Sequence, residues 1–400
     1  MHRYDGRQSV VSGRVRGQLP IESRVPARRE RCGRNPSLVQ MTEPYIYVYH
    51  MQIFRQFRLS RSRDIVSPSK PMEMTMSDQT EDAKTALILG ATGGIGGAVA
   101  QGLALRGWRI RALGRNAAEA ARRQPYFDWV QGDAMQAEDV LKAAEGADVI
   151  VHAVNPPGYR NWGQLVLPML DNTIAAAKAV GARIVLPGTV YNFGPDVFPN
   201  VTEDSAQRPK TRKGAIRVQM ERRLKAAAEQ DGTPVIIVRA GDFFGGFRAN
   251  SWFSQAMVTP GKLISSVTYP GKRGVGHQWA YLPDVAETMI RLIEKGDELP
   301  VFATYHMRGH WDGDGAQMVD AVRRVLGRSI KVKAFPWWIV PLAAPFVPFM
   351  RELREMSYLW DVPLEMRNDK LLAVLGEEPH TPMDAAVRAS LAAIGCLPAA

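Results

Sequence analysis

Residues 85–100 read Thr85-Ala-Leu-Ile-Leu-Gly90-Ala-Thr-Gly93-Gly-Ile-Gly96-Gly-Ala-Val-Ala. The apolar run before Gly90 is typical of a buried strand, and a helical pattern follows Gly96. Between them stand three glycines in the spacing Gly-x-x-Gly-x-x-Gly. Glycine permits a tight turn and lets backbone N–H groups at a helix start approach a pyrophosphate. Because a second strand is expected at Trp108–Leu113, the glycines have the βα context of a dinucleotide site.

Strand and helix patterns go on alternating after this unit. Strands are predicted at Thr85–Leu89, Trp108–Leu113, Trp129–Gln131, Asp148–Val154, Arg183–Leu186 and Pro234–Arg239. Helices are predicted between them at Gly94–Arg106, Ala117–Arg123, Ala137–Glu145, Trp162–Val180 and Lys213–Gln230. Continuous apolar strands separated by helices indicate a parallel sheet covered on both faces. The predicted fold class is α/β, a doubly wound parallel sheet with a smaller C-terminal substrate domain.

Three regions are expected along the 400 residues. Residues 1–76 are predicted to be a disordered basic extension, 84–245 a dinucleotide-binding domain, and 246–400 a substrate or lid region partly interleaved with the sheet. The extension holds 14 of the 51 Lys and Arg residues and six of the 40 Asp and Glu residues, and so carries +8 of the net charge of +11. The remainder is nearly neutral, which argues against a nucleic-acid partner for the folded part.

The extension has no sustained periodicity, and we interpret it as preceding a start at Met72, Met74 or Met76. A transit peptide or a nucleic-acid-binding arm is a less favoured alternative. No apolar run reaches the roughly 20 residues that a membrane span needs. The two cysteines, far apart in the chain, fit a reducing compartment, and we expect a cytoplasmic protein. A small-molecule substrate is the expected partner, and a homodimer is left open.

The end of the second predicted strand bears on the choice of cofactor. An NAD site calls for Asp or Glu about 20 residues past the glycines, but Gly114 and Arg115 stand there. Because a guanidinium can pair with a 2′-phosphate, NADP is favoured over NAD. The alternative is that Arg115 is a solvated surface residue.

Asp133 is placed to accept a hydrogen bond from the adenine amino group, to cap the next helix, or both. His152, inside an apolar strand, is interpreted as a buried histidine.

The chain resembles the short-chain dehydrogenase/reductase superfamily in its extended form, which is similar to the NAD-dependent epimerases and dehydratases. The resemblance covers roughly residues 84–398 and rests on the glycine turn, on Gly132-Asp133, on Arg239-Ala-Gly-Asp-Phe-Phe-Gly245 and on Tyr281-Leu-Pro-Asp284-Val-Ala. It implies a Rossmann domain with a small, variable C-terminal domain. The residues expected to hold the dinucleotide are Gly90, Thr92, Gly93, Gly94, Ile95, Gly96, Arg115, Asp133, Ala134, Ala153, Val154, Asn155, Arg217 and Ala240.

The family's usual chemistry requires Ser or Thr after the fifth strand and then Tyr-x-x-x-Lys on the next helix. Here Thr189 fills the hydroxyl position, Lys213 takes the tyrosine position, and Arg217 takes the lysine position. None of the 11 tyrosines has lysine four residues later. The chain therefore resembles the atypical branch, and its candidate catalytic residues are Thr189, Tyr191, Lys213 and Arg217. Tyr191 would replace the phenol or be a packed tyrosine, and Arg217 would bind the ribose or be a surface arginine.

Other residues have both a functional and a structural interpretation. Side chains expected to line a pocket beside the nicotinamide are Asn155, Trp162, Phe243, Phe244, His277 and Trp279. His306, His310, Asp312 and Asp314 could form a metal cluster, but are better explained as a strand end and as caps of a helix near Ala316. We therefore predict no metal. Asp284 is predicted to be an N-cap.

The segment Phe335–Met350 is apolar, and its four prolines exclude one straight helix. Three interpretations stay open: core of the C-terminal domain, a lid over a substrate pocket, and a membrane-surface contact. The first two are favoured.

These features favour an NADP-dependent reductase or dehydrogenase acting on an unidentified carbonyl or hydroxyl group, with Thr189 and Tyr191 polarising the oxygen. One alternative is a non-catalytic NADP-binding sensor or structural subunit. Another is a sugar-nucleotide epimerase or dehydratase, which the missing tyrosine disfavours.

Overall fold

The computed structural model describes residues 83–156, 161–246 and 251–398. All of them belong to the second of the two units into which the chain divides, Ser69–Ala400. The predicted extension at 1–76 lies outside the described residues. The predicted boundary between a cofactor domain and a substrate region remains a proposal.

Seven parallel strands form the main sheet, in the order β11-β7-β5-β4-β1-β2-β3. These strands are β1 (Thr85–Leu89), β2 (Arg109–Gly114), β3 (Asp128–Gln131), β4 (Val149–His152), β5 (Arg183–Gly188), β7 (Val235–Arg239) and β11 (Phe302–His306). In the register, Ala86 of β1 lies opposite Ile110 on one side and Val149 on the other. The predicted strands and fold class are confirmed, with shifts of one or two residues at the strand ends.

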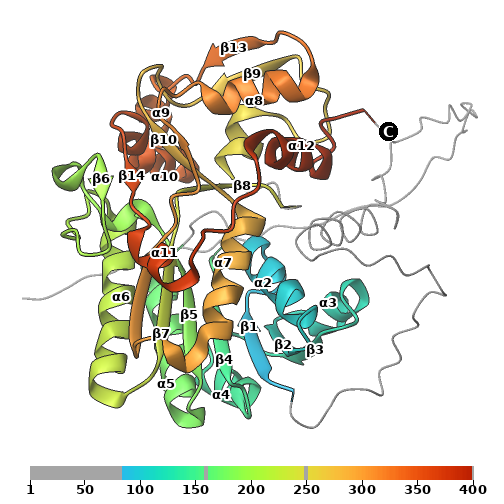
Figure 1. Ribbon diagram of the computed structural model, residues 1–400, viewed down its shortest axis with the longest axis vertical. Coiled ribbons are helices and arrows are strands. Elements are labelled where there is room, and N and C mark those ends of the chain that lie inside the picture. The colour runs from blue at the N-terminus through green and yellow to red at the C-terminus, as the bar shows by residue number, and fades with distance from the viewer. Residues whose placement is uncertain (1–82, 157–160, 247–250, 399–400) are drawn as a thin grey trace, which may run out of the picture. The chain divides into compact units, whose positions relative to one another are not determined.

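Helices cover both faces of this sheet because the strands are apolar on both sides (Figure 1). Alternate residues of β1 belong to different cores: Ile88 joins the first cluster and Leu87 the second. On the first side α2 (Gly94–Ala104) packs against α7 (Leu282–Lys295). On the second side α4, α5 and α6 follow one another. Their bounds are Ala137–Ala144, Trp162–Val180 and Arg212–Asp231, and α3 (Ala117–Arg123) packs on β3.

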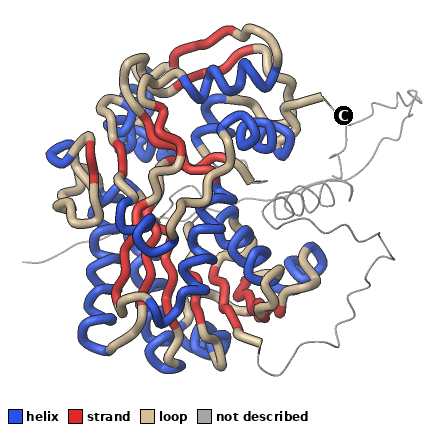
Figure 2. Tube along the Cα trace, viewed as in Figure 1, coloured by secondary structure: helices blue, strands red, loops and turns tan. Residues whose placement is uncertain are grey.

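Three small sheets are built mostly from the chain after β7, and their short strands are seen apart from the main sheet in Figure 2. They pair β12-β10-β8, β13-β9 and β14-β6. Their strands are β6 (Asn200–Val201), β8 (Asp242–Phe244), β9 (Ser266–Tyr269), β10 (His277–Tyr281), β12 (His310–Asp312), β13 (Lys331–Ala334) and β14 (Glu365–Met366). The remaining helices are α8 (Gln317–Leu326), α9 (Ile339–Ala343), α10 (Pro348–Met356), α11 (Asp369–Leu375) and α12 (Met383–Ala393).

The part of the chain after β7 has its own apolar core, but two of its segments pack with the main sheet. The third apolar cluster contains Trp279, Val322 and Leu391. Between the elements that build it, β11 returns to the edge of the main sheet and pairs with β7. α7 likewise packs on α2. Both segments therefore belong to the sheet in space and to the later region in sequence.

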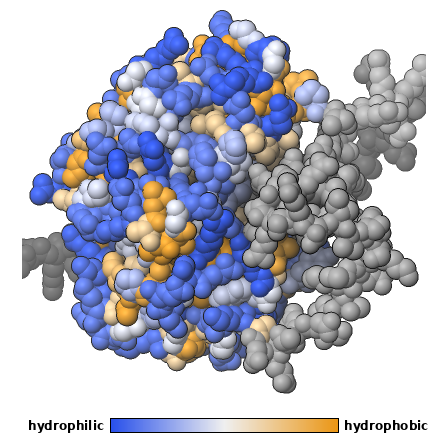
Figure 3. All heavy atoms as spheres, in the orientation of Figure 1, coloured by the Kyte–Doolittle hydropathy of each residue, from blue (hydrophilic) through white to orange (hydrophobic). Residues whose placement is uncertain are grey.

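The surface seen in Figure 3 is mostly hydrophilic, with hydrophobic residues in separate groups. No helix among the described residues is long and apolar enough to cross a membrane.

Candidate functional site

The glycine turn joins β1 to α2 and packs directly on the end of β4. Gly90 has φ +95°, and a Cβ there would lie 2.5 Å from the carbonyl oxygen of Ala153. A Cβ on Gly96 would lie 2.4 Å from the carbonyl oxygen of Gly90. Side chains at these two positions would therefore push the backbone apart. These glycines shape the turn itself.

The start of α2 is open to an anion. Its N-cap is Gly93, no side chain caps it, and its first turn holds no acidic residue. The first N–H groups of a helix have no acceptor within the helix and attract negative charge. Thr92 is exposed, and Gly93, Gly94 and Ile95 are partly exposed. The residues present thus fit the pyrophosphate of a dinucleotide.

At the end of β2 the structure places Arg115 in an exposed turn directly after Gly114. The Arg115 carbonyl accepts a hydrogen bond of 2.6 Å from the side chain of Gln131, which holds the backbone of the turn. Nearby, the Asp133 carboxylate accepts from the Met135 N–H at 3.0 Å, just before α4. Asp133 is not the N-cap of α4, which is Gln136, and its side chain only holds the turn before the helix. Its contact with adenine stays a prediction.

Three predicted residues gather beyond the ends of β4 and β5. The indole N–H of Trp162 donates to the Asn155 side chain at 2.6 Å. The guanidinium of Arg217 lies 5.2 Å from the centroid of the Trp162 ring and donates to the Pro187 carbonyl at 3.3 Å. Arg217 is thus directed from α6 to the carboxyl edge of the sheet, where doubly wound folds bind ligands.

His152 lies at the end of β4 and is buried, as the sequence indicated. Its Nδ1 lies 2.8 Å from the Thr173 hydroxyl. Burial, helped by the charge of Arg217, lowers the pKa of His152 to about 3. The ring is therefore neutral at ordinary pH.

Thr189 and Tyr191 lie on the loop after β5. The Thr189 Oγ1 accepts from the Tyr191 N–H at 3.4 Å and lies 3.4 Å from the Asn192 side chain. The start of α6 closes on this loop, since a Cβ on Gly214 would lie 2.2 Å from the Tyr191 carbonyl oxygen. The structure thus brings the candidate hydroxyl residues next to the first turn of α6.

Lys213 stands in that first turn, at the position predicted to match the tyrosine of the family. Its side chain is 2% exposed, and its ammonium lies 2.5 Å from a carboxylate oxygen of Glu352 on α10. It also donates to the Glu352 carbonyl at 2.9 Å. Burial lowers the pKa of Lys213, and the contact with Glu352 opposes that shift. The catalytic role of Lys213 stays a prediction, because its ammonium is held by another element.

A buried polar network behind this loop was missed from the sequence. Arg239, at the end of β7, donates from Nε to Glu221 of α6 at 2.9 Å and lies 2.8 Å from Nε2 of His306. Glu221 also accepts from Gln207 at 3.0 Å, which in turn accepts from Asn192 at 3.1 Å. The only sequence signal was the glutamate four residues after Arg217, one helical turn away.

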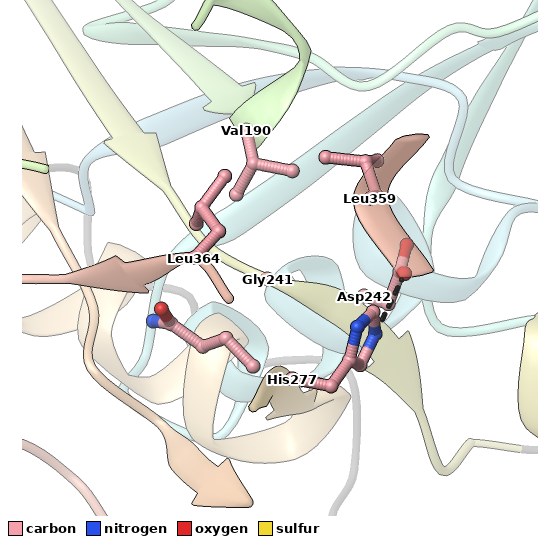
Figure 4. A pocket seen from close by; sticks show the side chains of 7 residues that line it. Val190, Gly241, Asp242, His277, Leu359 and Leu364 are labelled. Carbon is pink, nitrogen blue, oxygen red and sulfur yellow. Dashed lines mark hydrogen bonds and ion pairs between the residues drawn. The ribbon is translucent and has the colours of Figure 1, made fainter. Parts of the chain in front are cut away.

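A small cavity lies beside the loop after β5, lined by Val190, Gly241, Asp242, His277, Gln278, Leu359 and Leu364. Figure 4 shows His277 joined to Asp242, with Val190, Leu359 and Leu364 around the same space. The His277 Nε2 lies 3.0 Å from the Asp242 carboxylate, and its ring stacks on Trp360 with centroids 3.8 Å apart. His277 therefore lines this cavity, and its predicted place beside the nicotinamide stays a prediction.

Burial corrects the expectation for two aromatic residues. Phe244 and Trp279 are 0% exposed in the third core cluster, so they are core residues and not a pocket wall. The side chains of Ala240 and Ala134 are 2% and 8% exposed and pack in the first and second clusters. The contact of these two alanines with the dinucleotide stays a prediction.

The acidic residues outside this site have structural partners. Asp284 is not an N-cap: it lies in the first turn of α7 and accepts from the N–H and hydroxyl of Thr381, both at 2.7 Å. Asp312 accepts from the first backbone N–H groups around α8, at 3.0 Å from Ala316 and Gln317. The capping interpretation of Asp312 is thus confirmed. Within the described part of the chain, no three His, Cys, Asp or Glu side chains gather as a metal site.

A doubly wound sheet with an open glycine turn at its carboxyl edge defines a dinucleotide-binding protein of the short-chain dehydrogenase/reductase type. Residues 86–307 match the model of the NAD dependent epimerase/dehydratase family, more than half of the chain. The chain belongs to this family, and a nicotinamide dinucleotide is its cofactor. No curated protein sequence is similar enough to count as a relative.

Solved structures of epimerases share the fold. UDP-glucuronic acid 4-epimerase from Bacillus cereus in complex with NAD is 14% identical, with a TM-score of 0.62, covering 78% of this chain and 98% of its own. UDP-N-acetylglucosamine 4-epimerase from Bacillus cereus is 15% identical, with a TM-score of 0.59 and coverages of 80% and 98%. A putative epimerase from Burkholderia cenocepacia J2315 is 20% identical, with a TM-score of 0.59 and coverages of 79% and 99%.

Proposed function

We propose that this protein is a nicotinamide dinucleotide-dependent oxidoreductase that acts on a carbonyl or hydroxyl group without the usual tyrosine. The observation that carries the proposal is the position of Arg217. Its guanidinium reaches the Pro187 carbonyl and the Trp162 ring at the carboxyl edge of the sheet, where the family's lysine binds the nicotinamide ribose. The ribose-binding half of the usual pair is thereby kept in altered form.

The tyrosine of the usual pair, which handles the proton, has changed more than the lysine. The ammonium of Lys213 is held by Glu352, so we assign the oxygen-polarising role to Thr189 and Tyr191 on the adjoining loop. Thr189 would position the oxygen by a hydrogen bond, and the Tyr191 phenol would donate to it. The bound cofactor would supply or accept the hydride.

NADP is the proposed form of the cofactor. Arg115 is exposed after β2, and Gly114 supplies no carboxylate to accept from a ribose 2′-hydroxyl. The likeness to an NAD-bound epimerase does not decide between the two forms, since at 14% identity it shows the fold alone.

A second candidate is a sugar-nucleotide epimerase or dehydratase. Family membership favours it, and similar solved structures contain UDP-sugars together with NAD. The lysine at the tyrosine position weighs against it, because those reactions also need a proton acceptor beside the sugar hydroxyl.

The test is turnover by the purified full chain. NADPH and NADH oxidation would be followed across a panel of ketones and aldehydes, and a panel of UDP-sugars would be examined for epimers and dehydrated products. Removing a general acid typically costs about 10²–10⁴-fold, so Tyr191→Phe should lower turnover by at least that factor with unchanged cofactor affinity. Tyr126→Phe, at an exposed tyrosine, is the matched control.

Each result separates the candidates. Full activity in both Tyr191→Phe and Thr189→Val would contradict the assigned residues. UDP-sugar conversion would favour the second candidate. Tight NADPH binding without turnover of any compound would favour a non-catalytic sensor or structural subunit.

A further inference from the structure

The segment Phe335–Met350, which contains α9, leaves three large apolar side chains exposed. Trp338, Leu342 and Phe346 are 70%, 66% and 85% exposed. Leu342 lies on α9, Trp338 is the N-cap of this helix, and Phe346 follows it in a turn, so the three stand at intervals of four residues. We call these three residues the apolar stripe. The interpretation of the segment as core is therefore wrong for these side chains.

The opposite side of the same segment is anchored. Val340 and Ala344 are each 3% exposed, and the Trp337 indole donates to the Pro270 carbonyl at 2.7 Å. The segment is thus held against the protein by one face and presents apolar side chains on the other. It contains no charged residue at all. A face meant for water would carry polar side chains.

Cations lie on and beside α10, the helix that packs against α9. Lys210, Arg351 and Arg354 line a surface hollow together with Ala344 of the anchored face and the single carboxylate Glu355. We call it the basic hollow. All three cations are exposed, whereas the carboxylates of α10 turn toward the buried Lys213, with Glu352 at 2.5 Å and Glu355 at 4.0 Å. α10 thus directs its negative charge inward and its positive charge outward.

We propose that the apolar stripe and the basic hollow dock on the surface of an anionic lipid bilayer. Trp, Leu and Phe side chains beside Lys and Arg are the combination that inserts shallowly at the interface of such a bilayer. The basic hollow would take lipid phosphates while the stripe enters the acyl boundary. Charge complementarity selects this occupant over a second copy of the chain, which would bring the same cations face to face. Nothing in this proposal depends on the proposed reaction.

The experiment uses the full chain and co-sedimentation with phosphatidylcholine vesicles, with and without phosphatidylglycerol. The wild-type protein should bind the phosphatidylglycerol vesicles and be released by high salt. The triple variant Trp338→Ser, Leu342→Ser and Phe346→Ser should lose at least about tenfold in binding. The pair Arg351→Gln and Arg354→Gln should lose the preference for anionic vesicles, on the order of tenfold.

The matched control is a triple variant at equally exposed apolar residues elsewhere, Leu105→Ser, Tyr126→Ser and Leu263→Ser. It should bind as the wild type does. Every variant should keep the wild-type melting temperature, because the altered side chains are exposed.

The proposal is overturned if the wild type binds neither kind of vesicle. It is also overturned if the stripe variant binds like the control, since residues 1–82 would then carry the binding. It is overturned as well if the stripe variant loses a dimer that the wild type forms on size exclusion, while the wild type binds no vesicles.

Discussion

The ammonium of Lys213 lies 2.5 Å from the carboxylate of Glu352, which follows it by 139 residues. By the predicted alignment with the family, Lys213 takes the position of the proton-donating phenol. Its ammonium joins the first turn of α6 to α10. The contact therefore connects a helix of the main sheet with the later region.

Replacing Lys213 with methionine should test that connection. The change leaves Glu352, which is 19% exposed, without its cation. We expect the free energy of unfolding to fall by about 1–3 kcal/mol in urea titrations. Adding Glu352→Leu should restore part of the loss, since the unpaired carboxylate is then removed. Strictly additive effects of the two changes would show that the pair is not coupled.

The buried pair of Arg239 and Glu221 should matter more for stability. Both side chains are at most 5% exposed, so Glu221→Ala leaves an uncompensated guanidinium in the core. A loss of about 3–5 kcal/mol in unfolding free energy is expected. Glu229→Ala, at a solvent-exposed pair on the same helix, should change stability by less than about 0.5 kcal/mol. Similar losses in the two variants would contradict this view of the network.

Two glycines of the turn should respond differently to substitution. A Cβ on Gly93 meets only the Gly90 carbonyl oxygen, at 3.1 Å, whereas one on Gly96 would lie 2.4 Å from it. Gly93→Val should therefore abolish dinucleotide binding while circular dichroism stays native, because its side chain fills the space of the pyrophosphate. Gly96→Ala should lower both binding and the melting temperature. NADPH binding retained by Gly93→Val would refute the assignment of the site.

Arg115 should set the preference for NADP. A hydrogen bond to a charged group contributes about 1.5–3 kcal/mol, or roughly tenfold to a hundredfold in affinity. Arg115→Ala should lower NADP affinity by that factor and leave NAD affinity unchanged, as measured by titration of both dinucleotides. Arg122→Ala, at an exposed arginine on α3, is the control. An unchanged ratio of the two affinities would reassign Arg115 to the solvated surface.

Asp284 should make stability depend on pH. Burial raises the pKa of Asp284 from 3.8 to about 6. Between those values the folded chain holds a proton that the unfolded chain releases, so its stabilising contribution falls as pH rises from 4 to 6. The difference in unfolding free energy between wild type and Asp284→Asn should shrink by up to about 3 kcal/mol over this interval. Parallel profiles for the two proteins would show that the carboxyl does not titrate there.

The main sheet could be predicted because its strands are continuous apolar runs between amphipathic helices. β1 and α5 were located to the residue. β8 and β10 could not be found in this way. β10 is buried along its whole length although it contains His277 and Gln278, because Asp242 and the Met307 carbonyl satisfy them. Partners that remove the cost of burying polar groups are invisible in a local pattern.

The candidate site, too, was predictable only where its signals are local in the sequence. The glycines and the shift from lysine to arginine at Arg217 are local, and so they were visible in the sequence. The contact of Lys213 with Glu352 joins distant segments, and no spacing rule connects them. The exposure of Trp338, Leu342 and Phe346 could not be predicted either. An apolar run indicates side chains that avoid water, but it does not indicate what packs against them.

The return of β11 to the main sheet limits how this protein could be recombined. A chimera that joins residues up to Gly245 to the later half of another family member would take the edge strand and α7 from the donor. It would therefore have to match β7 and α2 of the recipient as well as any new substrate. Substrate range in such an architecture changes more readily through single loops than through exchange of whole halves. A graft confined to the segment between β13 and β14 leaves every strand of the main sheet in place.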